Sequence, residues 1–432
     1  MTTTSGDPDA RLSIGAVIER LMPQGVPFRF TAYDGSAAGP ADSPIHLHLK
    51  NERGLSYLLT APGDLGMARA YVSGDLDFEG AHPGDPYPAM VHLMNHLRFT
   101  MPPPGETFRI IRALGFGNLK PPPPPPQETL PRWRRVLEGM RHSRLRDAGV
   151  IRHHYDVSNR FYEMVLGPSM TYTCACYPRA DATLEEAQAF KYDLVCRKLG
   201  LRPGMRLLDL GCGWGGMVRH AAANYGVRAL GVTLSRQQAE WAQEAIKRDR
   251  LDDVAEVRFQ DYREVAETGF DAVSSIGLTE HIGVRNYPAY FRRIEEKLVP
   301  GGRLLNHCIT RPNNLATDTG AFIDRYVFPD GELTGSGRII TEMQNAGLEV
   351  RHEENLREHY ALTLRGWCEN LVAHWDDAVA EVGIGTAKVW GIYMAGSRLA
   401  FERNEIQLHQ VLGVKPDDRG RSGFPLRPDW LT

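Results

Sequence analysis

The most constraining feature of this sequence is a short apolar run that leads directly into a glycine-rich turn. Residues 207–210 are apolar except for Asp209, glycines follow at 211, 213, 215 and 216, and helix-like sequence continues to about residue 223. A strand, a tight loop and a helix in this order place backbone N–H groups around a nucleotide-like ligand. In the alternative interpretation, the glycine turn only packs a helix against a sheet. The sequence on either side of the turn favours a cofactor site.

The flanking residues also indicate which cofactor is bound. Gly211, Gly213 and Gly216 fit the dinucleotide pattern G-x-G-x-x-G, but a nicotinamide site also needs an acidic residue about 20 positions later. The second strand, 228–235, contains no carboxylate. Asp209 before the glycines, and the Asp261–Tyr262 pair after the third strand, suit S-adenosylmethionine (SAM) better, because its ammonium, carboxylate and adenosine groups replace the pyrophosphate.

Composition sets the broad class of the protein. A chain of 432 residues, 42% hydrophobic and 24% charged, is long enough for two domains with cores of their own. The net charge of −3 gives no general affinity for nucleic acid. We see no signal peptide, no membrane span and no zinc-like ligand spacing, so we expect a cytoplasmic protein without a metal site. Its cysteines are scattered and expected to be reduced: Cys174, Cys176, Cys196, Cys212, Cys308 and Cys368.

The chain is expected to have three parts. Residues 1–100 form a small α+β domain with a helix at 14–22 and a strand at 45–49, and residues 101–130 form a linker with six consecutive prolines in extended conformation. Residues 131–432 form the catalytic domain, where strands and helices alternate as in a doubly wound, mostly parallel α/β sheet. The strands are expected at 206–210, 228–233, 255–259, 271–276 and 303–309, and the helices at 184–199, 236–248, 287–299 and near 364–382.

A basic segment follows the prolines. It is interleaved with apolar residues, so it is either an amphipathic helix on an anionic membrane surface or a solvated helix face that pairs with the other domain. Its arginines are Arg132, Arg134, Arg135, Arg141, Arg144, Arg146 and Arg152.

Five residues outside the glycine loop are candidates for a functional role. Ser235 and Gln238 fit a capping box at the start of a helix, and they also lie where the second strand of a SAM fold meets the ribose. Glu280 follows a strand at the edge where ligands bind in open α/β sheets. His307 and Ile309 share one face of the next strand, where spacing alone favours a satisfied core histidine.

Seven sequence motifs, which occur in the same order, resemble those of the cyclopropane-fatty-acyl-phospholipid synthases over about 151–412. The N-terminal domain resembles the lipid-binding domain of that family only loosely. The motifs lie at 154–159, 170–175, 208–216, 231–235, 260–263, 280–283 and 325–331. The resemblance implies a class I SAM-dependent methyltransferase that adds a methylene across the double bond of an unsaturated acyl chain of a membrane phospholipid. It also implies a peripheral position at the inner membrane face and a homodimer.

The resemblance supplies the roles of individual residues. It implies a bicarbonate ion held at the reaction centre by Cys174, Glu280, His307, Ile309 and Tyr360. Cation–π stabilisation is expected from rings such as Tyr172. The predicted cofactor residues are Tyr172, Thr173, Asp209, Gly211, Gly213, Gly215, Thr233, Ser235, Gln238, Asp261 and Tyr262.

The sequence departs from the family pattern near the expected acyl site. Cys176, Thr279 and Cys368 stand where the family commonly has aromatic residues, and Ser397 replaces a frequent cysteine. These changes bear on chain preference and product more than on cofactor use. Three alternatives therefore stay open: a methylene- or methyl-branched product, an acyl-carrier-bound or small-molecule substrate, and a non-catalytic lipid-binding protein.

Overall fold

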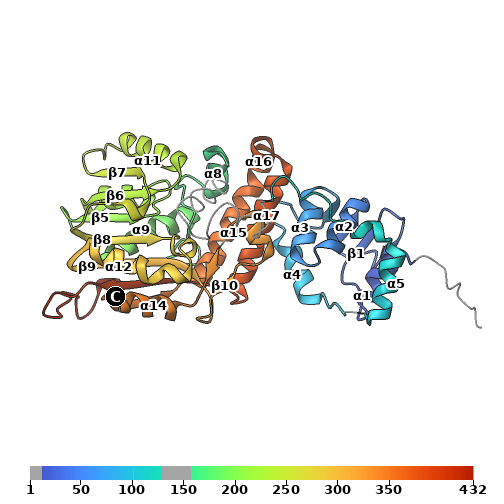
Figure 1. Ribbon diagram of the computed structural model, residues 1–432. Coiled ribbons are helices and arrows are strands. Elements are labelled where there is room, and N and C mark those ends of the chain that lie inside the picture. Colours follow the sequence, from blue (N-terminus) through green and yellow to red (C-terminus); the bar gives the residue numbers. More distant parts are fainter. Residues whose placement is uncertain (1–11, 101, 129–156, 330, 432) are drawn as a thin grey trace, which may run out of the picture. The chain divides into compact units, whose positions relative to one another are not determined.

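The computed structural model describes residues 12–100, 102–128, 157–329 and 331–431, which divide into two compact units (Figure 1). The first unit contains the described N-terminal residues up to 128 together with Leu371–Gly396, and the second contains the remainder. The basic segment and His154–Asp156 of the first motif lie outside the described residues, so both predictions stay open.

The first unit is a small α+β structure, as its sequence pattern predicts. Its sheet has the strand order β2-β1-β3-β4, with β1 and β3 parallel. Alternating residues such as Phe30, Leu47 and Leu49 are buried in its core. The elements are α1 (Ile14–Leu21), β1 (Arg29–Ala32), β2 (Ala37–Ala38), β3 (His46–Leu49), α2 (Glu52–Thr60), α3 (Asp64–Val72), β4 (Leu76–Glu79), α4 (Tyr87–His96), α5 (Pro104–Leu114), the 3₁₀ turn η1 (Phe116–Leu119), α16 (Trp375–Val382) and part of α17 (Ile384–Glu402).

Two segments of this unit differ from what the sequence pattern predicts. The predicted linker contains helix α5, and its proline-rich part is held against the unit, because the Tyr57 hydroxyl donates to the Pro123 carbonyl at 2.6 Å and Arg69 pairs with buried Glu128. In addition, Leu371–Gly396 packs with the N-terminal residues: the Lys388 ammonium donates to the Tyr71 carbonyl at 3.2 Å. Contacts between segments so far apart in the chain produce no local pattern in the sequence, so the sequence does not predict them.

The second unit is a doubly wound α/β structure, which confirms the predicted fold class. Its seven-stranded sheet has the order β12-β13-β9-β8-β5-β6-β7; β5 to β9 are parallel, and β13 runs antiparallel to both of its neighbours, β9 and β12. The strands are β5 (Arg206–Leu210), β6 (Arg228–Thr233), β7 (Ala255–Phe259), β8 (Phe270–Ile276), β9 (Leu298–Thr310), β12 (Glu349–Asn355) and β13 (Gln407–Val414).

Helices cover both faces of this sheet (Figure 1). Leu207 packs in one apolar cluster with α9, α10 and α11, whereas its neighbour Leu208 packs in the other with α12 and α14, because successive strand residues point to opposite faces. The helices are α8 (Asn159–Leu166), α9 (Leu184–Leu199), α10 (Gly216–Tyr225), α11 (Arg236–Arg248), α12 (Tyr287–Lys297), α13 (Ala321–Tyr326), α14 (Ser336–Asn345), α15 (Arg357–Ala373) and the end of α17. The short elements are η3 (Tyr262–Glu264), η4 (Thr279–His281), η5 (Val284–Asn286), β10 (Thr317–Asp318), β11 (Glu332–Leu333) and η6 (Asp429–Leu431).

Most predicted elements have the expected bounds. Strands β5, β6 and β7 and helices α9 and α11 agree residue for residue, and the helical stretch predicted near 364–382 is two helices, α15 and α16. The strand order reverses between β5 and β8, which is where ligands bind in sheets of this kind.

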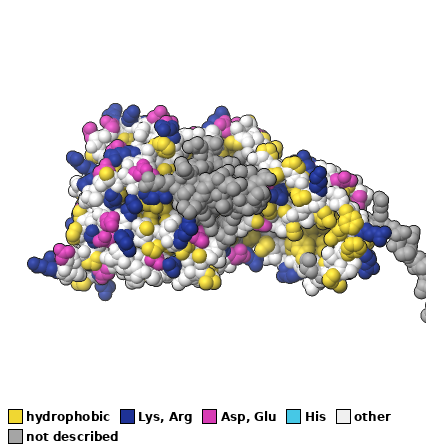
Figure 2. Space-filling model, viewed as in Figure 1, with side chains coloured by type: hydrophobic (Ala, Val, Ile, Leu, Met, Phe, Trp, Pro, Cys, Tyr) yellow, Lys and Arg dark blue, Asp and Glu magenta, His cyan; other side chains and the backbone are white. Residues whose placement is uncertain are grey.

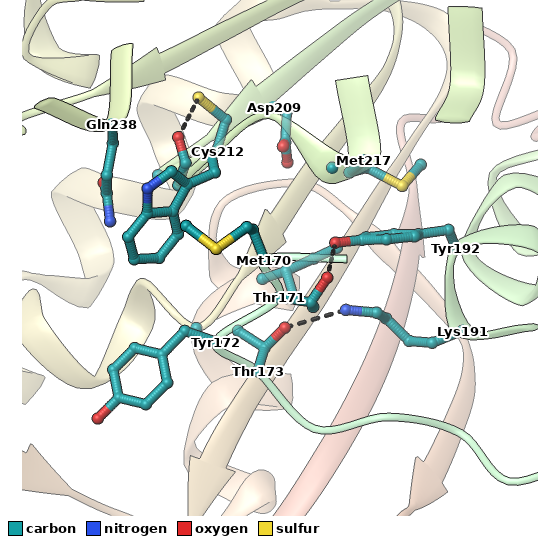
Figure 3. Close-up of a pocket in the computed structure, with 16 residues that line it drawn as sticks. Met170, Thr171, Tyr172, Thr173, Lys191, Tyr192, Asp209, Cys212, Met217 and Gln238 are labelled. Atoms are coloured by element: carbon teal, nitrogen blue, oxygen red, sulfur yellow. Dashed lines mark hydrogen bonds between the residues drawn. The ribbon is translucent and has the colours of Figure 1, made fainter. Parts of the chain in front are cut away.

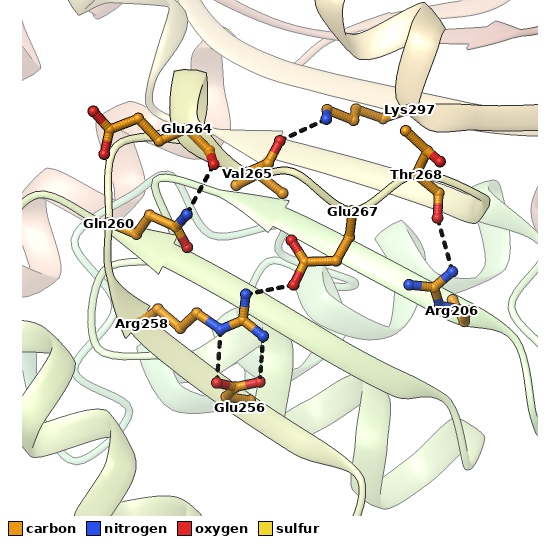
Figure 4. A network of polar contacts seen from close by, with 9 residues as sticks. All are labelled: Arg206, Glu256, Arg258, Gln260, Glu264, Val265, Glu267, Thr268 and Lys297. Atoms are coloured by element: carbon orange, nitrogen blue, oxygen red, sulfur yellow. Dashed lines mark hydrogen bonds and ion pairs between the residues drawn. The ribbon is translucent and has the colours of Figure 1, made fainter.

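The loop that follows β7 is held by a polar network (Figure 4). Arg258 pairs with Glu256 and Glu267, and the Lys297 ammonium donates to the Val265 carbonyl at 2.6 Å. This network fixes the loop that carries Asp261 and Tyr262. Among the helices of the described residues, none combines the length and apolar character needed to cross a bilayer.

Candidate active site

The glycine loop after β5 borders open space at the carboxyl edge of the sheet. Gly211, Gly213 and Gly215 have φ angles of 69°, 54° and 75°, a left-handed conformation that favours glycine. A Cβ atom built at Gly213 would meet no atom of the described residues within 4 Å. No side chain of the described residues caps the first turn of α10, which leaves its backbone N–H groups available to a ligand.

A pocket opens between this loop and the segment 170–173 (Figure 3). The empty space in it is about 520 Å³, a volume that includes open solvent at its mouth. Its lining residues are Met170, Thr171, Tyr172, Thr173, Lys191, Tyr192, Asp209, Gly211, Cys212, Gly213, Trp214, Gly216, Met217, Gln238, Ile276 and Gly277.

The charged side chains in the lining are one acid and one base. Asp209 at the end of β5 accepts a hydrogen bond from the Ser274 hydroxyl at 2.6 Å, and burial raises the pKa of its carboxyl to about 7. Lys191 on α9 donates to the Thr173 hydroxyl at 3.0 Å, and burial lowers the pKa of its ammonium to about 8. The pocket therefore presents one group of each sign to a zwitterionic ligand.

The wall opposite the glycine loop is pre-organised by hydrogen bonds. The Thr171 and Tyr192 hydroxyls lie 2.7 Å apart, and the Gln188 amide donates to the Thr173 carbonyl at 2.9 Å. Gly277 allows close approach on this side, because a Cβ atom there would lie 2.8 Å from the Thr173 side chain.

The predicted cofactor residues fall into two groups. Tyr172, Thr173, Asp209, Gly211, Gly213 and Gln238 line the pocket. Gly215, Thr233, Ser235, Asp261 and Tyr262 lie outside its lining, although Thr233 ends β6 and Asp261 follows β7 at the same edge of the sheet.

Ser235 and Gln238 form half of the predicted capping box. The Ser235 hydroxyl caps α11 by accepting the Gln238 backbone N–H at 3.3 Å. The Gln238 side chain accepts instead from the Thr233 hydroxyl at 2.8 Å. Capping thus accounts for Ser235, whereas Gln238 reaches the pocket.

A second polar group is buried where β8 and β9 end. Glu280 in η4 accepts the Ile309 backbone N–H at 2.7 Å through Oε1, so these two predicted residues lie together. Its Oε2 is buried without a hydrogen-bond partner in the described part of the chain. Burial raises the pKa of this carboxyl to about 7.

His307 is the neighbour of Ile276 in the pairing of β9 with β8, and Ile276 lines the pocket. The His307 side chain is fully buried, and its Nδ1 lies 3.2 Å from the Gln410 amide nitrogen. Its Nε2 has no partner among the described residues. Burial, together with the charges of Lys191 and Lys198, holds the pKa of His307 well below its usual range, so the ring is neutral at pH 7. It is therefore not the satisfied core histidine that spacing alone favours.

Cys174 and Tyr360 come from the segment before α9 and from α15. The Cys174 thiol is fully buried, and burial raises its pKa far above the ordinary value, so it is protonated. The next residue, Ala175, donates its backbone N–H to the Thr363 hydroxyl at 3.0 Å, one helical turn from Tyr360. The Tyr360 ring packs on Phe401 at 4.5 Å between centroids and edge-on to Trp367 at 6.1 Å.

Rings also connect this region to the pocket. The Tyr172 ring lies 5.4 Å from Trp367 and 5.9 Å from Tyr162, between centroids. Tyr172, Trp367 and Tyr360 therefore form a continuous aromatic wall between the pocket lining and α15.

Sequence reasoning missed three residues. Lys191, Lys198 and Gln410 are fully buried polar side chains. The charge of Lys191 adds to the lowering of the His307 pKa, and it partly offsets the rise that burial causes in the pKa values of Asp209 and Cys174. The available signal was the pair of lysines seven positions apart on helix α9, on a face that they share with buried Leu194 and Val195. Gln410 carries no local signal, because it is brought to His307 only by strand pairing.

Comparison with known proteins gives a consistent result. The family model described as mycolic acid cyclopropane synthetase matches residues 142–411. A probable fatty acid methyltransferase of Mycobacterium tuberculosis is 61% identical over 422 residues, covering 97% of this chain and 99% of that protein. The cyclopropane-fatty-acyl-phospholipid synthase of Escherichia coli K12 is 36% identical over 268 residues, covering 62% of this chain and 68% of its own.

Solved structures agree with the sequence comparison. The mycolic acid cyclopropane synthase CmaA1, in complex with SAH and CTAB, superposes with a TM-score of 0.58 at 32% identity. The match covers 62% of this chain and 97% of that one.

Proposed function

Because this chain belongs to the mycolic acid cyclopropane synthetase family of SAM-dependent methyltransferases, we propose that it makes cyclopropane fatty acids from the unsaturated acyl chains of phospholipids. In this reaction the alkene attacks the methyl group of SAM, SAH leaves, and loss of a proton from the added methyl closes the ring. The observation that carries the proposal is an open pocket suited to SAM together with buried Glu280 and His307, each of which has a polar atom without a partner among the described residues, and His307 pairs across the strands with Ile276 of the pocket lining.

The pocket residues fit SAM by charge and shape. The Asp209 carboxylate suits the ammonium of the amino acid part, and the Lys191 ammonium suits its carboxylate. Backbone N–H groups of the glycine loop add further donors. When bound, SAM supplies an electrophilic methyl, and the task of the chain is to hold the alkene close and aligned, since an alkene is a weak nucleophile.

The buried polar atoms fit a bicarbonate ion, which supplies a base for the methyl proton. Glu280 Oε2 can accept the hydroxyl hydrogen of this ion, and the His307 ring can donate to one of its oxygens. Burial keeps water away from both groups, so a charge held between them acts strongly on the reacting chain. The aromatic faces of Tyr172, Trp367 and Tyr360 supply cation–π stabilisation to positive charge that develops on the acyl chain.

The test is an incubation of purified protein with SAM and liposomes of a cis-monounsaturated phospholipid, followed by mass spectrometry and NMR of the released acyl chains. We expect a mass gain of one methylene and ring protons at unusually high field. A vinylic methylene signal would identify the branched product instead, which has the same mass. No added carbon would refute phospholipid acyl chains as the substrate.

The first unit offers a surface for the membrane that carries this substrate. Phe99, Phe108 and Phe116 are 57–61% exposed, and Phe108 and Phe116 lie 6.2 Å apart between ring centroids. Arg109 and Arg112 share helix α5 with Phe108, and Figure 2 shows hydrophobic side chains gathered on this unit beside lysines and arginines. Exposed aromatics flanked by cations are typical of surfaces that bind anionic lipid.

Sedimentation with anionic liposomes tests this surface. Phe108→Ser and Phe116→Ser with Arg112→Glu are expected to reduce the bound fraction. The matched control is Phe259→Ser with Arg236→Glu, which removes an exposed cation–π pair from the second unit and is expected to leave binding unchanged. Equal loss in both variants would contradict a specific surface on the first unit.

A further inference from the structure

A chain of hydrogen bonds runs from the sheet edge to His307. Glu354 on β12 pairs with the Lys198 ammonium on α9, and this ammonium also donates to the Gln410 Oε1 on β13 at 2.7 Å. The Gln410 amide nitrogen in turn lies 3.2 Å from Nδ1 of His307, its direct cross-strand neighbour on β9. Four elements of the second unit thus converge on one imidazole.

The direction of every bond in this chain follows from its first member. An ammonium has only donors, so the Gln410 atom that contacts Lys198 must be its carbonyl oxygen. The other end of the amide is then an NH₂ group, which donates to His307. The remaining hydrogen of this NH₂ group faces Cys176, whose sulfur lies 3.9 Å from the Gln410 amide nitrogen. Cys176 is one of the positions where this sequence departs from the family pattern.

An imidazole nitrogen that accepts a hydrogen bond carries no proton. Since His307 Nδ1 accepts from Gln410, the single proton of the neutral ring lies on Nε2. That Nε2 is buried and has no partner among the described residues, so it is a donor directed at a site that those residues leave unfilled.

Burial makes this arrangement costly. Lys198 and Gln410 are fully buried, and removing an ammonium from water costs free energy even when it is paired, as Lys198 is with Glu354. A methionine or leucine would fill such space without that cost, so packing alone does not account for a lysine there.

We propose that Lys198 and Gln410 are positioning residues that hold the His307 proton on Nε2, so that His307 presents a hydrogen-bond donor to an anion at the reaction centre. The presence of that anion rests on the proposed function, whereas the position of the proton does not. With the opposite tautomer, a lone pair of Nε2 would face the anion and repel it.

NMR of protein labelled with ¹⁵N in its histidine rings tests the proton position without any substrate. Long-range ¹H–¹⁵N correlations distinguish the two neutral tautomers, and His307→Gln identifies the signals of His307 by their disappearance. We expect a neutral ring protonated on Nε2 in the wild type. A proton on Nδ1, or a doubly protonated ring at pH 7.5, would overturn the proposal.

Variants test whether Lys198 and Gln410 are responsible. Lys198→Met allows the side-chain amide of Gln410 to rotate by 180°, so that its oxygen faces His307. Gln410→Leu removes the NH₂ donor to His307 Nδ1. Each variant is therefore expected to give an Nδ1–H signal or a mixture of tautomers. Lys198→Arg keeps a donor and is expected to restore the Nε2–H form. If both Lys198→Met and Gln410→Leu retain a pure Nε2–H ring, the proposal is wrong.

Lys191→Met is the matched control. It removes a second fully buried ammonium from the same helix, but Lys191 contacts Thr173 rather than Gln410, so the tautomer is expected to stay unchanged. If the proposed function also holds, Lys198→Met lowers kcat by at least about tenfold with an unchanged Kd for SAH. A tautomer change without any activity on phospholipids would refute the proposed function alone.

Discussion

The glycine-loop pocket and the Glu280–His307 group lie at the same edge of one sheet, yet they are built in opposite ways. The pocket is open and is lined largely by residues from two short segments, 170–173 and 209–217. Glu280 and His307 are buried, and their hydrogen-bond partners come from other parts of the chain, as with Gln410, which is 103 positions after His307.

This difference matches two tasks. A cofactor must enter and leave at every turnover, which an open pocket permits. A base that acts on a buried acyl chain works best without water, and the burial of Glu280 and His307 excludes water from them. This burial leaves Glu280 Oε2 and His307 Nε2 without a partner among the described residues, which costs free energy. Both sites nevertheless contain one carboxyl whose pKa is raised to about 7 by burial.

The largest expected effect separates turnover from cofactor binding. Glu280→Gln keeps the shape and an acceptor for the Ile309 N–H, but removes the charge, so we expect turnover to fall by about 10²–10⁴-fold. Calorimetric titration with SAH should give a Kd within about twofold of the wild type. Weakened SAH binding of the same size as the activity loss would show that the two sites are not separable.

The converse change acts on the pocket. Asp209→Asn removes the carboxylate offered to the SAM ammonium, and we expect the Kd for SAH to rise by about 10–100-fold, the value of a charged hydrogen bond. In the wild type, binding should tighten as the pH rises from about 5 to 7, because the Asp209 carboxyl ionises near pH 7 while Lys191, with a pKa of about 8, still carries its charge, and this dependence should disappear in the variant. An unchanged Kd at pH 8 would exclude a contact between Asp209 and the cofactor.

Stability should respond to pH at both carboxyls in the same direction. Between about pH 4 and 7 the folded protein keeps the Asp209 and Glu280 protons while the unfolded chain releases them, so the free energy of unfolding falls as the pH rises through this window. Asp209→Asn and Glu280→Gln should therefore each be more stable than the wild type at pH 8, by at least about 1 kcal/mol or 2–4 °C in Tm. This gain in stability should vanish towards pH 4, which thermal melts of the variants and the wild type across the range measure. A gain that stays the same at pH 4 and pH 8 would contradict the raised pKa values.

The smallest effect concerns a residue at the border of the pocket. If capping is the whole role of Ser235, Ser235→Ala should cost about 1 kcal/mol of stability and leave the Kd for SAH unchanged. Thr183→Ala, which removes the capping box of α9 outside the pocket, is the control and should give a similar loss. A raised Kd in Ser235→Ala alone would assign Ser235 to the cofactor.

Much of the second unit follows from local sequence. The glycines at 211, 213 and 215, the alternation of Leu207 and Leu208 between two apolar clusters, and the bounds of β5, β6, α9 and α11 are readable because periodicity and turn chemistry act over a few residues. The family motifs add Glu280 and His307, whose roles spacing alone does not reveal.

Only the tertiary structure decides which polar atoms stay unpaired and which way a proton points. His307 Nε2 has no partner among the described residues, and the donor character that we propose for it depends on Lys198 and Gln410, which come from a helix before the glycine loop and from the last strand of the described sheet. The packing of Leu371–Gly396 with the N-terminal unit is of the same kind. Local sequence sets the conformation of a segment through nearby sterics and burial, whereas hydrogen-bond partners in a core are chosen by strand pairing across the whole chain.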